Sequence, residues 1–197
     1  MRLVIVILLL SSAAHAEKKP APWWAFGVAA PLALPNHVLL HESSHALAGL
    51  AVGFDIQGFH PYPHTNEGSL YLGRVPWESK QYPSKGQLLA FYGAPFVMDV
   101  GLFALSDTLL STGAVEHRSV AGVFLYTMGL LAPLIDFAKG YFMPDNFRYV
   151  DGHFHGSDWA VMRGQGRGTA WALNVVGAVA IAVGVWRFVQ HSRRMFR

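Results

Sequence analysis

The chain has 197 residues, of which 52% are hydrophobic and only 14% are charged, whereas about 25% of residues are charged in ordinary soluble domains. With a mean hydropathy of +0.29, this composition indicates an integral membrane protein and argues against a soluble domain. The net charge of +3 is too small to indicate a nucleic-acid partner, and the absence of cysteine excludes disulfides and thiolate metal ligands.

The first segment, residues 1–16, has an early arginine, an apolar run and small residues at its end. The apolar run is shorter than the ~20 residues that span a bilayer, so the pattern predicts a secretory signal peptide that is cleaved before Glu17. An uncleaved signal anchor is the alternative. Residues 17–197 are predicted to form a single membrane-embedded domain.

An H-E-x-x-H motif, His41-Glu42-Ser43-Ser44-His45, lies within the almost wholly apolar residues 25–54. On a helix, this i, i+4 spacing places both imidazoles on one face, where they can bind the same metal ion. Ionisable side chains in such a segment are costly and are typical of a functional site. Zinc suits the motif, because two histidines and a third protein ligand leave one position open for water. Glu42 is then predicted to be the general base that takes a proton from the metal-activated water.

Two prolines, Pro31 and Pro35, are expected to break the apolar stretch before the motif. Asn36 is a suitable N-cap, so the motif helix is predicted over residues 37–52.

The residues after the motif alternate between polar and apolar segments. Residues 55–87 contain many prolines and glycines and are predicted to be non-helical, with a short hairpin or re-entrant strand at residues 70–75. Further membrane spans are predicted at residues 88–112, 119–139 and 169–189, with a polar segment at residues 140–168. The predicted fold class is therefore an all-α integral membrane protein of about four transmembrane helices, with a metal site between helices.

A catalytic zinc site needs a third protein ligand, and three aspartates are candidates. Asp136 is preferred, because it ends a hydrophobic span, where an unpaired carboxylate is costly, and because it approaches the same side of the membrane as the motif. Asp99 lies in the middle of its span and can instead pair with a polar neighbour. Asp158 is the alternative third ligand, and it requires its loop to fold back onto the bundle.

These motifs resemble, in the same order, those of the site-2 proteases, which are intramembrane zinc metallopeptidases that cut transmembrane substrates. Residues 41–45 are similar to the first motif of the family, residues 92–95 to its second, and residues 130–136 to its third, while residues 70–75 lie where the family has its membrane-associated hairpin. The family usually has glycine after the last aspartate, where this chain has Phe137. The resemblance implies that His41, His45 and Asp136 bind zinc and that Glu42 is the catalytic base.

The sequence therefore predicts an intramembrane zinc-dependent endopeptidase that cleaves transmembrane or membrane-associated proteins. It is expected to be a multi-pass protein of a lipid bilayer, the bacterial inner membrane. Two alternatives stay open. A catalytically inactive relative of the proteases would bind and retain membrane partners. A non-enzymatic metal-handling membrane protein would use histidines in the polar loops, namely His60, His64, His153 and His155.

Overall fold

The computed structural model describes residues 21, 23–66, 69–71, 73–79, 81–142, 148–150, 153–155 and 157–197. The predicted signal peptide, residues 1–16, lies outside these described residues. The described part is mostly helical, as predicted, with short strands in the connections between helices.

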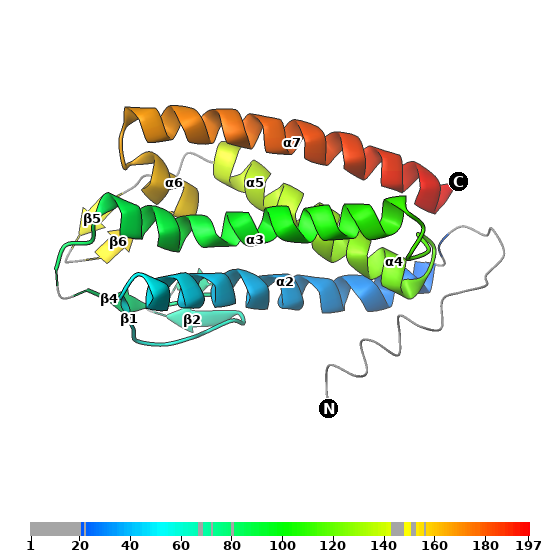
Figure 1. The fold of residues 1–197 in the computed structure, drawn as a ribbon. Coiled ribbons are helices and arrows are strands. Elements are labelled where there is room, and N and C mark those ends of the chain that lie inside the picture. The colour runs from blue at the N-terminus through cyan, green and yellow to red at the C-terminus, as the bar shows by residue number, and fades with distance from the viewer. Residues whose placement is uncertain are drawn as a thin grey trace.

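In the described part of the chain, four helical passes run along the length of the molecule (Figure 1). Helix α2 (Trp23–Ala51) packs against helix α3 (Lys85–Ser111), and the chain ends in helix α7 (Arg167–Phe196). The remaining pass is composite. It consists of helix α4 (Val120–Leu125), the π-helix η1 (Tyr126–Leu131) and helix α5 (Ala132–Phe142).

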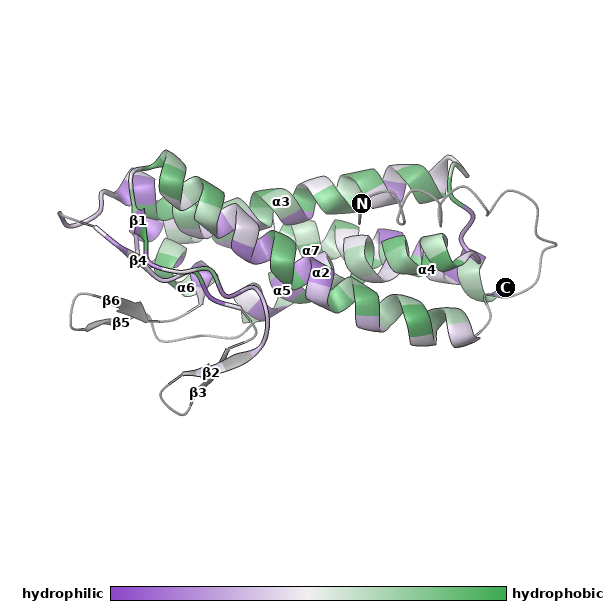
Figure 2. Cartoon of the chain, turned by 90° about the horizontal axis from the view of Figure 1, so that it is seen from below, coloured by the Kyte–Doolittle hydropathy of each residue, from purple (hydrophilic) through white to green (hydrophobic). Residues whose placement is uncertain are grey.

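Three of these passes are long and apolar enough to cross a membrane, namely Lys85–Ser111, Val120–Phe142 and Arg167–Phe196. Figure 2 shows hydrophobic residues along the length of the helices. Helix α2 has 29 residues, which is also long enough. However, it is not among these three passes, and it carries three histidines, one glutamate and one asparagine. The prediction of about four spans therefore agrees with three helices in length and composition, and α2 is not among them.

Helix α2 is continuous through Pro31 and Pro35, which corrects the predicted break. A proline removes one backbone hydrogen bond from a helix, but neighbouring helices can compensate for this loss in a bundle. Ala29 and Ala33 are completely buried beside the two prolines, so this part of the helix is held by packing. Asn36 is consequently inside the helix, where its side-chain amide donates to the Leu32 carbonyl oxygen at 2.6 Å.

Gly49, four residues after the last histidine of the motif, allows α2 to lie close to α3. A Cβ atom on Gly49 would lie 2.7 Å from Cδ1 of Ile56, a distance that real Cβ atoms essentially never show, and 3.1 Å from the ring of Phe91, which is tighter than most Cβ contacts. The rings of Phe54 and Trp77 stack at 4.1 Å next to Phe91 and close this end of the core. The motif helix is thus packed tightly against the first two turns of α3.

Helix α3 begins three residues before the predicted span. Ser84 and Gln87 form a capping box, in which the Ser84 hydroxyl accepts from the Gln87 backbone N–H. The Gln87 side chain also donates to the Val52 carbonyl oxygen at 2.8 Å, at the end of α2. The cap therefore fixes both the start of α3 and its position relative to the motif helix.

The strands of the described segments form three separate two-stranded antiparallel sheets. Strands β1 (Asp55–Ile56) and β4 (Trp77–Glu78) are the first and last strands of the connection between α2 and α3, and they pair with each other. The hairpin itself consists of β2 (His64–Asn66) and β3 (Ser69–Tyr71), so it begins six residues before the predicted 70–75, and Val75 is a buried core residue beyond it. The second connection contains β5 (Arg148–Val150) and β6 (His153–His155).

Candidate metal centre

Helix α2 presents three histidines at successive turns of one face. His37 and His45 are buried, with exposed fractions of 7% and 5%, and His41 lies between them. The ring centroids are 6.3 Å apart for His37 and His41 and 5.2 Å apart for His41 and His45. The predicted clustering of the two motif histidines on one helical face is therefore observed.

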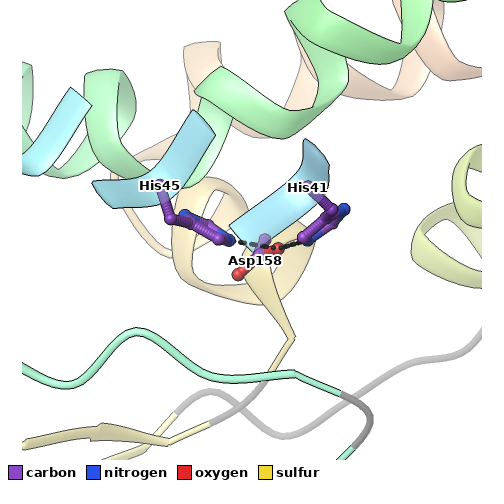
Figure 3. Close-up of side chains that lie close together, drawn as sticks. All are labelled: His41, His45 and Asp158. Carbon is purple, nitrogen blue, oxygen red and sulfur yellow. Dashed lines mark hydrogen bonds and ion pairs between the residues drawn. The ribbon is translucent and has the colours of Figure 1, made fainter. Parts of the chain in front are cut away.

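Asp158 completes a group with the motif histidines. It is the first residue of the short helix α6 (Asp158–Arg163), which Ser157 caps. Its Oδ2 atom lies 3.2 Å from Nε2 of His41 and 3.1 Å from Nε2 of His45 (Figure 3). The ligand atoms of the three residues lie within 4.8 Å of one another, so this group could hold a metal ion.

The other ring nitrogen of each motif histidine faces an acceptor. His45 Nδ1 donates to the Phe91 carbonyl oxygen at 2.9 Å, so in the neutral ring Nε2 carries the lone pair. His41 Nδ1 lies 3.1 Å from Oδ2 of Asp136, which is an ion-pair distance. Metal-binding histidines are oriented in this way, by an oxygen acceptor on the nitrogen that does not bind the metal.

The donor set fits a divalent transition metal. Two imidazole nitrogens and one carboxylate oxygen converge, and if both rings are neutral all three atoms are acceptors. Acceptors at such distances repel unless a proton or a metal ion lies between them. The Asp158 carboxyl is suited to the role of ligand. Burial acts to raise its pKa, but when His45 and His41 are protonated, their charges and hydrogen bonds outweigh burial and hold the pKa of this carboxyl group well below its ordinary value.

Asp136, the predicted third ligand, lies on the opposite side of the His41 ring from Asp158. Its Oδ2 atom is buried and makes no aligned hydrogen bond within the described part of the chain. The structure thus brings both candidate aspartates to His41. The alternative ligand, Asp158, is the one that also reaches His45.

Asp99 does not join the group. It lies on α3 and pairs with His37, which precedes His41 by one turn of α2. The Oδ1 atom of Asp99 lies 2.8 Å from Nε2 of His37, and the aspartate is completely buried. This pairing agrees with the expectation that a mid-span aspartate finds a polar partner. It also links α2 to α3 in the interior of the bundle.

Glu42 is buried, with an exposed fraction of 7%, and is covered by the segment that follows the hairpin. A Cβ atom on Gly73 would lie 2.5 Å from Cγ and 2.7 Å from Cδ of Glu42. Only glycine leaves room for the carboxyl group at this position. Backbone hydrogen bonds between His60 and Arg74 hold the covering segment in place.

Sequence reasoning missed two features of this centre. It did not foresee the Phe91 carbonyl as an acceptor or His37 as the polar partner of Asp99. A signal for the pairing was present in the sequence, because His37 precedes His41 by the same four residues that separate His41 from His45. The metal group found within the described residues is made of His41, His45 and Asp158, and the side chains of the loop histidines His64, His153 and His155 lie outside that description.

Comparisons with known proteins add no assignment to this geometry. The chain matches no family model, and no curated protein or solved structure is significantly similar to it.

Proposed function

We propose that the chain is a multi-pass zinc-dependent endopeptidase of the bacterial inner membrane that cleaves transmembrane or membrane-associated proteins. The proposal rests on one observation: both histidines of the H-E-x-x-H motif converge with Asp158, and the motif glutamate is buried beside them. His41, His45 and Asp158 would hold the ion, with Asp136 orienting His41. Zinc is favoured because nitrogen and carboxylate ligands in a three-residue site suit it, with one position left for water.

The chemistry would be hydrolysis of a peptide bond. When bound, zinc supplies a Lewis acid that activates water and polarises the scissile carbonyl group. Glu42 would accept a proton as the water oxygen bonds to the carbonyl carbon. It would return that proton to the amide nitrogen as the C–N bond breaks, so the products are a carboxylic acid and an amine. The buried position of Glu42 limits the access of other water to this proton transfer.

Removal of the metal tests this function directly. We expect the purified protein in detergent to cleave members of a pooled library of apolar peptides, detected by mass spectrometry, and to lose this cleavage after dialysis against EDTA. Addition of zinc should restore it, whereas addition of magnesium should not, because magnesium prefers an octahedral set of oxygen ligands. Cleavage that continues after the metal content falls to zero would contradict the proposal.

A substitution in the covering segment tests the role of Glu42 without changing that residue. In Gly73→Ala, the new Cβ atom must displace the carboxyl group of Glu42, which is the mobile end of a side chain, so the fold should survive. Misplacement of a reacting group by about 1 Å can cost about 10²-fold in rate. We therefore expect peptide cleavage to fall about 10- to 100-fold while the zinc content stays unchanged.

Gly101→Ala is the matched control, because a Cβ atom at that position in α3 meets nothing within 4 Å. Equal cleavage rates in the two variants would show that the contact between residue 73 and Glu42 does not position the base.

A further inference from the structure

The pair formed by His37 and Asp99 contains an atom that the metal centre does not explain. Oδ1 of Asp99 is bonded to His37, but Oδ2 is buried and has no hydrogen-bond partner within the described residues. Buried polar atoms in folded proteins almost always have a partner, so each exception requires a water molecule, an ion or a function. This atom lies in the interior of the bundle, where Asp99 has an exposed fraction of 0%.

The second aspartate of the same helix shows what a purely structural pair looks like. Oδ1 of Asp107 accepts from Nε of Arg187 at 2.7 Å and from Nε2 of His191 at 2.8 Å, and its Oδ2 accepts from Nη2 of Arg187 at 3.0 Å. Both oxygens are bonded, and an arginine neutralises the charge. Asp99 joins two helices in the same way but has neither form of compensation.

The charge partners of the aspartates near the motif also favour a cation beside Asp99. The ion partners of Asp99, Asp136 and Asp158 within the described residues are all histidines, and none is an arginine or a lysine. A histidine compensates the charge of a carboxylate only while it is protonated, whereas a bound cation compensates that charge in either state of the ring.

From these observations we propose that His37 and Asp99 form a second divalent-cation site, one helical turn from the metal centre. The site offers Nε2 of His37 and both carboxylate oxygens of Asp99, and water fills the remaining positions. The carboxylate of Asp136 lies close enough to interact electrostatically with both residues, so it adds attraction for a cation. The chain then holds two ions in line along α2. This inference depends on the metal centre but not on peptide hydrolysis.

The number of zinc ions per chain tests it. The full chain, purified in detergent, is equilibrated with zinc, separated from free zinc and measured by mass spectrometry of the metal. We expect two ions in the wild type and one in Asp99→Asn, an isosteric change that keeps the hydrogen bond to His37 but removes the charge. Titration with cobalt, followed by absorption, should reach its end point at two equivalents and one equivalent, respectively.

Asp107→Asn is the matched control in the same helix and should keep two ions. A wild type that saturates at one ion, or an Asp99→Asn variant that keeps two, would overturn the second site. A wild type with two ions that cleaves no peptide would instead contradict the proposed function and leave the second site standing.

Discussion

Replacement of Asp158 by alanine is expected to remove one zinc ion per chain, the ion held by His41 and His45. Asp158 supplies the oxygen that both Nε2 atoms face, at 3.2 and 3.1 Å, and a two-histidine site without it lacks the third ligand that zinc needs. Asp136→Ala should have a smaller effect, with the same number of ions as the wild type and about 10- to 100-fold weaker affinity, as when an orienting group is lost. Zinc titration against a competing chelator measures both quantities.

His45→Ala should lose the same ion as Asp158→Ala, since it removes a ligand of the same site. Asp55→Ala is the control, because Asp55 lies in β1 on the surface. If zinc is retained in Asp158→Ala and lost in Asp136→Ala, Asp136 is the third ligand, as the resemblance to site-2 proteases implies.

Replacement of Glu42 by glutamine is expected to reduce peptide cleavage by about 10²- to 10⁴-fold, the usual contribution of a general base. Glutamine has nearly the same shape and can still fill the space beside Gly73, but it cannot accept the proton from water. The zinc content should stay unchanged, because Glu42 is not part of the metal group of His41, His45 and Asp158. Cleavage rates of the best library peptide, normalised to bound zinc, provide the measurement.

Glu78→Gln makes the same chemical change at an exposed position in β4 and should cleave at the wild-type rate. A Glu42→Gln protein with full activity would assign the proton transfer to another group. Loss of zinc together with activity would show that Glu42 supports the metal centre and is not solely a base.

Much of the fold could be predicted because membrane spans are encoded locally. A helix in a bilayer needs only sufficient length and apolar composition, so the spans at residues 88–112, 119–139 and 169–189 agree with α3, with the composite pass and with α7 to within a few residues at most ends. The less regular elements were harder to predict. The break at Pro31 and Pro35 was wrong, because packing of α2 within the bundle compensates for the lost hydrogen bonds.

The sequence by itself determined the two motif histidines, because four residues make one turn of a helix and place both rings on one face whatever surrounds it. Only the tertiary structure decided which carboxylates meet them. Trp159 is buried against Phe96 and Phe137 at ring distances of 5.1 and 6.1 Å. This packing anchors α6 and carries the neighbouring Asp158 to the motif, 113 residues after His45. A contact between residues so far apart in the sequence depends on how the helices pack. The residues next to Asp158 in the sequence therefore do not indicate which histidines it contacts.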